Sequence, residues 1–266
     1  MSLAAITGAS SGLGAVFARK LAARGHNLLL VARRQDRLEM LAQELSAAHG
    51  INVECGTADL AKADDLQRVA ARLESAADLT LLINNAGFGT RGRFWEADFA
   101  RQEEMYRVHV TATTTLTRAA LRPMVERNEG AIINVSSVAG FFRSGGNVSY
   151  CSTKAWMNAF TESLHLELES AGSRVRMQAL CPGFTYTEFH DVANVSREAI
   201  PKSWWMPADF VVEESLKGLD AGRLYVIPGW RYKLLVAVGT RLPLGWRLAT
   251  QRSSMHRRDK ALAAAR

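Results

Sequence analysis

Tyr150 and Lys154, four positions apart, are the two residues whose types and spacing most clearly permit chemistry. On a helix, residues i and i+4 lie on one face, so the phenol and the ammonium would be neighbours. A free phenol has a pKa of about 10, and a nearby ammonium favours the phenolate and lowers that pKa. Tyr150 could then donate a proton in a reduction and accept one in an oxidation near neutral pH.

A glycine-rich segment near the N-terminus is the second candidate. Residues 7–14 read Thr-Gly-Ala-Ser-Ser-Gly-Leu-Gly, between an expected strand at 3–7 and an expected helix at 13–24. Glycines at such a bend let the backbone approach a pyrophosphate, and the helix N-terminus supplies free N–H groups. This context favours a dinucleotide. The residues assigned to the contact are Gly8, Ser10, Ser11, Gly12, Leu13 and Gly14.

The end of the second expected strand, 27–32, bears on which dinucleotide is bound. Proteins that bind NAD usually carry an acid there, which holds the ribose hydroxyls. In this sequence Arg33 and Arg34 follow the strand, and guanidinium groups bind phosphate in a bidentate manner. The two arginines therefore favour a 2′-phosphate, and so NADP(H). Asp36 is expected to be the N-cap of the next helix rather than a ribose ligand.

The Gly-x-x-x-Gly-x-Gly spacing of residues 8–14 and the Tyr-x-x-x-Lys pair resemble those of the short-chain dehydrogenase/reductase family. The resemblance covers about residues 3–228. It implies that Tyr150 is the catalytic acid or base and that Lys154 also binds the nicotinamide ribose. Ser137 lies thirteen residues before Tyr150, as the catalytic serine does in the family. Its hydroxyl would polarise the carbonyl of a substrate.

The resemblance also implies further contacts with the cofactor. Asn-Asn-Ala-Gly at 84–87 would hold the central sheet and touch the ribose, and Pro-Gly-Phe-Thr-Tyr-Thr at 182–187 would fix the carboxamide. Asp59 would lie near the adenine, although it could equally cap a helix from residue 62. The residues assigned to these contacts are Asp59, Leu60, Asn85, Ala86, Gly87, Pro182, Gly183, Thr185 and Thr187.

One position departs from the family pattern. The family often carries Val-Asn-Val in the long helix after the fourth strand, and the asparagine holds a water in a proton relay from the lysine. This chain has Val108, His109 and Val110 at those positions. His109 could hydrogen-bond the same water and would then titrate near physiological pH, or it could be only a structural replacement. The substitution leaves undecided whether this chain has the proton relay, but it does not affect the prediction that Tyr150 and Lys154 act as a pair.

Hydrophobic periodicity indicates the elements that must position these residues. Apolar runs of strand length alternate with segments of helical spacing, which predicts an α/β fold with a single Rossmann-like, doubly wound parallel sheet and helices on both faces. The expected strands are 3–7, 27–32, 53–57, 79–84, 131–136, 174–181 and 224–226, and the expected helices are 13–24, 37–49, 62–76, 99–125 and 149–170. In a loop at 185–210, Trp204, Trp205 and Met206 either form an apolar wall for substrate or pack on the core.

The C-terminal part differs in charge from the rest. The chain has a formal net charge of +7, but residues 221–266 hold ten of the 33 basic residues and one of the 26 acids. Charge confined to one end does not fit a nucleic-acid binder. We therefore expect a dinucleotide-binding and catalytic domain at 1–228 and a basic appendage at 229–266. The appendage suits an anionic membrane surface, or a contact with another subunit or with the substrate site of its own chain.

The amino-acid composition further narrows the class of protein to which the chain can belong. A chain of 266 residues with 48% hydrophobic and 22% charged residues fits one globular core. Its three widely spaced cysteines suggest neither a zinc site nor a disulfide framework, and they fit a reducing compartment. We find no signal-peptide pattern and no apolar run that could span a bilayer. The expectation is a metal-free cytoplasmic protein, which the tail could hold at a membrane.

Together these features predict an NADP(H)-dependent oxidoreductase that transfers hydride between the nicotinamide and a carbonyl or secondary alcohol. Reduction of a lipophilic ketone, such as a 3-oxoacyl group or a steroid, is the favoured activity. Two alternatives stay open: an oxidative dehydrogenase of hydroxy compounds with relaxed cofactor choice, and a cofactor-binding sensor without turnover. Family habit implies a homodimer or homotetramer through the helices at 99–125 and 149–170.

Overall fold

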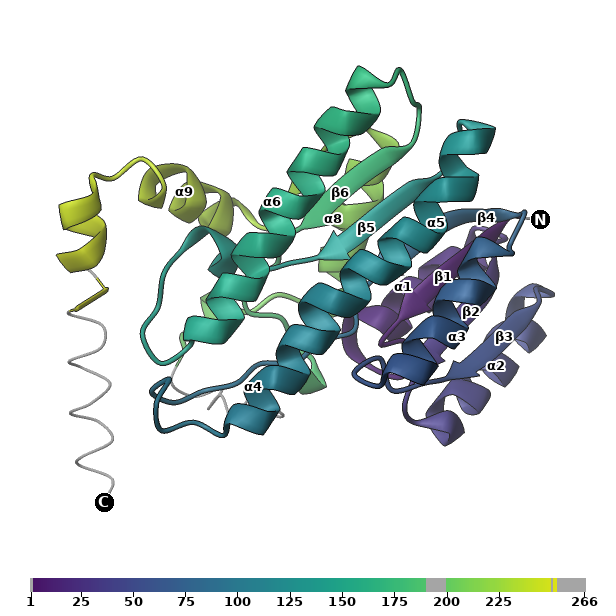
Figure 1. Cartoon of the computed structure of the whole chain (residues 1–266), viewed down its shortest axis with the longest axis horizontal. Coiled ribbons are helices and arrows are strands. Elements are labelled where there is room, and N and C mark those ends of the chain that lie inside the picture. Colours follow the sequence, from purple (N-terminus) through teal and green to yellow (C-terminus); the bar gives the residue numbers. More distant parts are fainter. Residues whose placement is uncertain (1, 190–199, 250, 253–266) are drawn as a thin grey trace.

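A computed structural model describes residues 2–189, 200–249 and 251–252. Its strands form one seven-stranded sheet in the order β3-β2-β1-β4-β5-β6-β7, in which all neighbours are parallel (Figure 1). The strands are β1 (Leu3–Thr7), β2 (Asn27–Ala32), β3 (Val53–Thr57), β4 (Leu79–Asn84), β5 (Ala131–Val135), β6 (Arg176–Leu180) and β7 (Tyr225–Val226). The predicted α/β fold with one doubly wound sheet is confirmed.

The central strands are apolar along their whole length because helices cover both faces of the sheet. In β1, Ala4 and Ile6 point into one core layer while Leu3 and Ala5 point into the other. The first layer is covered by α1 (Gly12–Ala23), α2 (Gln35–His49) and α8 (Ala208–Asp220). The second is covered by α3 (Ala63–Glu74), α5 (Thr113–Arg127) and α6 (Val148–Ser170), which lie in front of the sheet in Figure 1.

Three local predictions need correction. The helix expected at 99–125 is α4 (Phe99–Tyr106), a π-helical turn η1 (Arg107–Ala112) and then α5. The loop is predicted to extend to residue 210, but α8 already begins at Ala208. Residues 190–199 of that loop lie outside the described part. The N-cap of α2 is Arg34, so Asp36 lies in the first turn, where its charge still favours the helix dipole.

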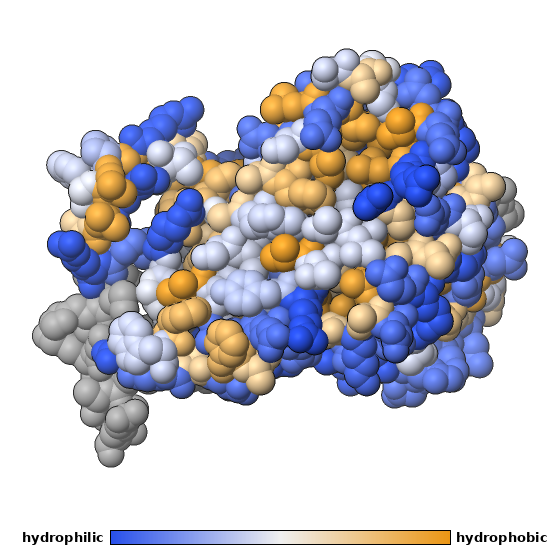
Figure 2. Space-filling model, in the orientation of Figure 1, coloured by the Kyte–Doolittle hydropathy of each residue, from blue (hydrophilic) through white to orange (hydrophobic). Residues whose placement is uncertain are grey.

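After β7 the chain continues into α9 (Trp230–Gly239) and a further helical stretch at 244–249. We call residues 230–249 and 251–252 the tail segment; residues 250 and 253–266 of the predicted appendage lie outside the described residues. The tail segment projects from the body at the left of Figure 1, and Figure 2 shows hydrophobic and hydrophilic residues side by side on it. In the described part of the chain, no helix has the length and apolarity needed to span a bilayer.

Tyr232 joins α9 to the body of the protein. Its side chain is buried, and its hydroxyl accepts a hydrogen bond from the Phe184 N–H (2.9 Å) and donates one to the Trp204 carbonyl (2.6 Å). The ring lies against Gly183, where a Cβ atom would come within 2.0 Å of it. The first turn of the tail segment is therefore packed directly on the loop that follows β6.

Candidate active site

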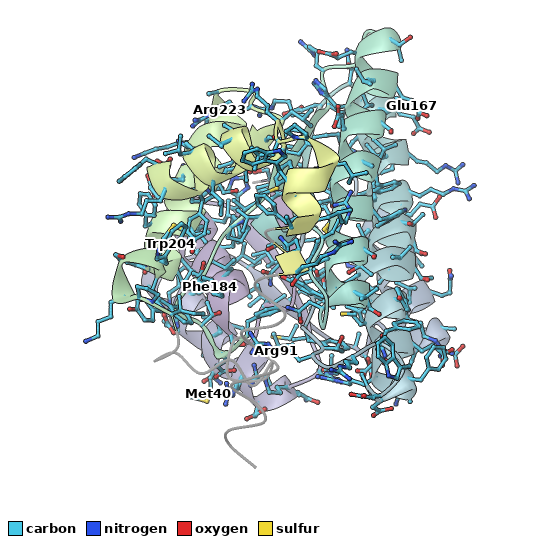
Figure 3. The ribbon with its side chains drawn as sticks, turned by 90° about the vertical axis from the view of Figure 1, so that its left-hand side faces the viewer. Met40, Arg91, Glu167, Phe184, Trp204 and Arg223 are labelled. Carbon is cyan, nitrogen blue, oxygen red and sulfur yellow. The ribbon has the colours of Figure 1, made fainter. Side chains whose placement is uncertain are left out.

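A cavity of about 1140 Å³ lies at the carboxyl ends of the strands, where ligands bind in open α/β sheets. Figure 3 views the molecule from the tail side and labels Phe184 and Arg91, which both line the cavity. The site residues predicted from the sequence that line it are Gly8, Ser10, Ser11, Gly12, Leu13, Arg33, Arg34, Asp59, Leu60, Asn85, Ala86, Gly87, Ser137, Tyr150, Lys154, Pro182, Gly183, Thr185 and Thr187. Gly14 and His109, also predicted as site residues, are not among the residues that line the cavity.

The glycine-rich turn is held in a shape that suits a phosphate. Gly8 and Gly12 have positive φ angles of 66° and 55°, which glycine adopts without a steric penalty. A Cβ atom on Gly14 would lie 2.3 Å from the Gly8 carbonyl oxygen, so that position needs glycine for close packing. The turn leads into the N-terminus of α1, whose N-cap residue makes no side-chain capping bond. Its N–H groups therefore face the cavity as a cradle for an anion.

A second loop braces this cradle. The Thr7 hydroxyl oxygen accepts hydrogen bonds from the N–H groups of Asn85 (2.9 Å) and Ala86 (3.0 Å). The Asn85 side-chain amide donates in turn to the carbonyl oxygens of Thr7 (2.9 Å) and Gly8 (3.2 Å). One residue earlier, Asn84 donates to Asn134 across β4 and β5 (2.9 Å). The Asn-Asn-Ala-Gly segment thus ties the centre of the sheet to the phosphate cradle.

Arg34 lies beside the same cradle. Its guanidinium donates to the Ser10 hydroxyl (3.0 and 3.2 Å) and the Ser11 hydroxyl (2.7 Å). It also forms an ion pair with Glu188 (3.0 Å), which pairs with Arg37 as well (2.6 Å). These hydrogen bonds, with Arg37 first, lower the pKa of Glu188 to about 2. Glu188 was not predicted from the sequence, and it lines the same end of the cavity.

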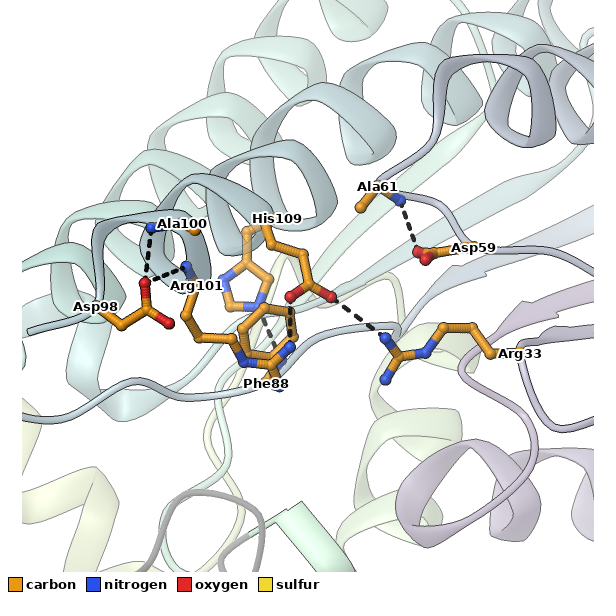
Figure 4. Close-up of polar contacts among 9 residues, drawn as sticks. Arg33, Asp59, Ala61, Phe88, Asp98, Ala100, Arg101 and His109 are labelled. Atoms are coloured by element: carbon orange, nitrogen blue, oxygen red, sulfur yellow. Dashed lines mark hydrogen bonds and ion pairs between the residues drawn. The ribbon is translucent and has the colours of Figure 1, made fainter.

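Arg33 also has a carboxylate partner that the sequence did not predict. Glu104 on α4 lies 3.2 Å from Arg33 and also pairs with Arg101. The Arg101 guanidinium lies 3.7 Å from the centre of the Phe88 ring (Figure 4). Both arginines assigned to a 2′-phosphate are thus present at the cavity, each next to a glutamate.

Asp59 makes a tight turn after β3. Its carboxylate accepts a hydrogen bond from the Ala61 N–H at 3.1 Å (Figure 4). The N-cap position of α3 belongs to Lys62, so the alternative in which Asp59 caps that helix is wrong. Asp59 and Leu60 line the cavity, and their contact with adenine stays a prediction.

Tyr150 and Lys154 stand on one face of α6, with Ser137 opposite them at the end of β5. The Lys154 ammonium lies 5.9 Å from the centre of the Tyr150 ring and donates to the Val135 carbonyl at 2.7 Å. Ser136 turns the other way and donates to the Lys154 backbone carbonyl (3.0 Å). Both serines line the cavity, and Ser137 is the one that hydrogen-bonds with the Tyr150 side chain.

The expectation that Lys154 lowers the pKa of Tyr150 is wrong for this arrangement. Burial raises the pKa of Tyr150 to about 12, and a hydrogen bond with Ser137 offsets only part of that rise. Burial also lowers the pKa of Lys154 from 10.5 to about 8, because the charged ammonium loses its hydration. Tyr150 therefore keeps its proton at neutral pH, while Lys154 is close to its titration point.

His109 is buried behind the cavity and is held at both ring nitrogens. Nε2 accepts a hydrogen bond from the Phe88 N–H at 3.1 Å (Figure 4), so the ring proton is assigned to Nδ1, which donates to the Thr153 hydroxyl (3.0 Å). That hydroxyl donates to the Tyr150 carbonyl (2.9 Å). Burial, with a smaller effect of Lys154, holds the pKa of His109 well below 6.5, so the predicted titration near physiological pH is wrong.

The cavity also has a largely apolar wall, next to Arg143 and Arg247. Phe189 packs near the Tyr150 ring, with ring centres 5.8 Å apart. The tail segment contributes to this wall, which agrees with the alternative that the appendage contacts the substrate site of its own chain. The apolar side chains here are Val138, Phe141, Phe142, Phe189, Leu235, Leu242, Leu244 and Leu248.

Trp204, Trp205 and Met206 follow the other alternative and pack on the core. None of the three is among the described residues that line the cavity. The Trp205 ring is buried and stacks on Tyr186, with ring centres 5.0 Å apart, and Trp204 packs edge-on against Tyr232. They shape the cavity only by supporting the loop after β6.

Comparisons with known proteins agree with this geometry. The short chain dehydrogenase family profile matches residues 2–197. An oxidoreductase of Myxococcus xanthus is 35% identical over 240 residues, which is 90% of each chain.

Two solved structures are similar over nearly their whole length. A short-chain dehydrogenase from Sphingobium yanoikuyae, in complex with NADPH, is 36% identical with a TM-score of 0.82 over 90% of this chain and 93% of that one. An alcohol dehydrogenase from Comamonas testosteroni, specific for bulky-bulky ketones, is 31% identical with a TM-score of 0.78 over 96% and 94%.

A dinucleotide cradle and a Tyr–Lys pair at the carboxyl edge of one parallel sheet define a class of oxidoreductases. With the profile match added, the chain belongs to the short-chain dehydrogenase/reductase family.

Proposed function

We propose that this protein is an NADP(H)-dependent reductase of lipophilic ketones. The observation that carries the proposal is one continuous cavity with Arg34 beside the glycine cradle at one end and Tyr150 at the other. A dinucleotide is an elongated molecule whose adenosine and nicotinamide ends need such separate sites.

The nicotinamide supplies the hydride when bound. Tyr150 holds the proton that the reduced carbonyl oxygen must receive, and its raised pKa of about 12 suits an acid more than a base. Ser137 orients and polarises that oxygen from the opposite side. Lys154, with a pKa of about 8, can return a proton toward Tyr150 and places a positive charge beside the ribose site.

The preference for NADP(H) rests on Arg34. Its contacts with Ser10 and Ser11 place a guanidinium and two hydroxyls around one point at the rim of the phosphate cradle. A 2′-phosphate would accept from all three and would replace Glu188 as the anionic partner of Arg34. The NADPH bound by the similar enzyme from Sphingobium yanoikuyae supports this choice.

The apolar wall supports a bulky lipophilic ketone as substrate. Phe142 and Phe189 offer aromatic surface near Tyr150, and Leu235 closes the wall from the tail segment. The cavity of about 1140 Å³ exceeds the usual range of roughly 300–1,000 Å³ for small-molecule sites, which favours a site for two molecules, a cofactor and a substrate. The bulky-ketone specificity of the Comamonas testosteroni enzyme supports the same class.

His109 in this proposal is a positioning residue. Its two ring nitrogens bind Phe88 and Thr153, so neither is directed at a water beside Lys154. It joins the loop after β4 to the helix that carries Tyr150. Of the two roles that the sequence left open, the structural replacement is the one we propose.

The test is a screen of NADPH oxidation against ketones graded by chain length and bulk. Turnover should rise with lipophilicity, and it should be lost in Tyr150→Phe while NADPH still binds. Tight NADPH binding without turnover on any ketone, or equal turnover with NADH, would overturn the proposal.

We also propose that the protein is a homo-oligomer through α5 and α6. On α6, Leu166 is exposed and the rings of Trp156 and Phe160 stack with centres 4.8 Å apart, and on α5 Val125 is exposed. Figure 2 shows hydrophobic residues among the surface residues of this face. Sedimentation of the wild type and of Leu166→Glu tests the proposal: only the wild type should be oligomeric.

A further inference from the structure

Helix α9 carries apolar side chains on two opposite faces. Tyr232 and Val236, four residues apart, are buried against the body of the protein. Trp230, Leu234 and Val238 are also spaced by four, lie about half a turn away at roughly 100° per residue, and are 67%, 56% and 52% exposed. A surface helix ordinarily places polar residues opposite its buried stripe. The second stripe therefore indicates a second apolar surface outside the described chain.

The same pattern continues after α9. In the helical stretch at 244–249, Leu244, Trp246 and Leu248 are exposed. The tail segment projects from the body (Figure 1). Within the described part of the chain, these side chains and the outer stripe of α9 are all exposed. Exposed apolar residues gathered in this way mark a site of contact with another surface.

The charge of the tail segment indicates which kind of surface it contacts. The described residues of the tail segment include five basic side chains and no acid. Arg231 and Lys233 fall on either side of the outer stripe of α9. Long basic side chains that flank an apolar stripe are typical of helices lying in the headgroup region of an anionic bilayer, where tryptophan is also favoured. The basic residues of the tail segment are Arg231, Lys233, Arg241, Arg247 and Arg252.

A second copy of the chain fits this surface less well. Residues 221–266 carry ten basic residues and one acid, so a two-fold contact between tail segments would oppose like charges. We propose that the tail segment docks on the surface of an anionic lipid bilayer, with the outer stripe of α9 in the acyl–headgroup boundary. The anionic headgroups attract the basic residues of the tail segment, and salt screens that attraction.

The docked surface adjoins the cavity. Leu235, Leu242, Leu244 and Arg247 belong to the tail segment and also line the cavity. Docking would therefore bring the cavity next to the lipid phase, from which a lipophilic ketone could enter without crossing water. This second part rests on the proposed function, whereas docking itself does not.

The test of docking is co-sedimentation of the full chain with vesicles of phosphatidylcholine alone or mixed with phosphatidylglycerol. We expect binding to the anionic vesicles that weakens as salt is raised. Leu234→Ser and Arg231→Gln/Lys233→Gln should each reduce the bound fraction, and the combination should reduce the affinity at least tenfold. Met40→Ser on α2 is the matched control, because Met40 is 69% exposed and Leu234 is 56% exposed. Such exposed substitutions leave the fold intact.

Three results would overturn docking. They are absence of binding to anionic vesicles, equal loss in Met40→Ser, and a change of oligomeric state rather than of vesicle binding in Leu234→Ser. Turnover of a vesicle-borne ketone should fall in Leu234→Ser, while turnover of a short water-miscible ketone stays unchanged. Vesicle binding without turnover on any ketone would refute the proposed function and leave docking standing.

Discussion

At one end of the cavity Arg33 and Glu188 are exposed and Arg34 is half-buried, and each of these charges has an opposite charge beside it. At the other end burial is the largest influence on the pKa of Tyr150 and Lys154, and also on that of His109 behind the cavity. Charge at the first end is partnered before a ligand arrives and is screened by solvent. Charge at the second is controlled by desolvation. Substitutions at the first end should change affinity, and those at the second should change turnover and its pH dependence.

Loss of the acid at the buried end should have the largest effect. Tyr150→Phe removes the proton donor and keeps the ring, so turnover should fall by about 10²–10⁴-fold. NADPH affinity, measured by the quenching of protein fluorescence, should change less than about threefold. A variant that retained a tenth of the activity would place the proton donor elsewhere.

At the exposed end, Arg34→Gln should weaken NADPH binding by about 10–100-fold, because hydrogen bonds to a charged group contribute about 1.5–3 kcal/mol. NADH binding should be unchanged. Arg37→Gln is the matched control, since Arg37 shares the partner Glu188 but is not among the residues that line the cavity. Equal losses for both cofactors would remove the assignment of a 2′-phosphate site.

The buried ammonium should appear in the pH dependence of stability. The folded-state pKa of Lys154, about 8, lies below its ordinary 10.5, so the unfolded chain binds more protons between these values and stability rises with pH there. Relative to Lys154→Met, the free energy of unfolding of the wild type should gain about 2 kcal/mol between pH 7 and about 9.5. Denaturant titrations of the two proteins measure that difference. A flat difference would mean that water reaches the ammonium.

The close approach of Gly87 to His109 predicts that substitutions at these two positions are energetically coupled. A Cβ atom on Gly87 would lie 2.6 Å from His109 Nε2, so Gly87→Ala should cost about 1–3 kcal/mol of stability. In a His109→Asn background the shorter side chain should relieve most of that cost. A double-mutant cycle of unfolding free energies checks it, and additive losses would contradict the contact.

The smallest effect is expected for Glu188→Gln. Removing one carboxylate partner of Arg34 should strengthen NADPH binding about two- to threefold at low salt, because the 2′-phosphate no longer displaces a charge. The gain should vanish at high salt. Weaker NADPH binding would indicate that Glu188 orders Arg34 rather than competing for it.

Motifs near strand ends could be predicted from the sequence because a parallel sheet brings all carboxyl ends to one edge. That rule is why Gly8, Asn85 and Tyr150, remote in sequence, meet in one cavity. The partners Glu104 and Glu188 could not be predicted, since they depend on how α4 and the loop after β6 turn over the sheet. The raised pKa of Tyr150 depends on burial, which spacing along a helix does not report. Helix α8 did leave a signal, in the spacing of Val211, Val212 and Leu216, that the loop prediction overlooked.

The contact between Gly183 and Tyr232 has an evolutionary consequence. The phenol ring fills the space that a side chain at position 183 would need, and its hydroxyl hydrogen-bonds to the backbone of Phe184 and Trp204. In an alignment of relatives, the two positions should therefore vary together, with an aromatic at the second only where the first is glycine. Chimaeras that exchange C-terminal segments between relatives should fold only when both positions come from the same parent.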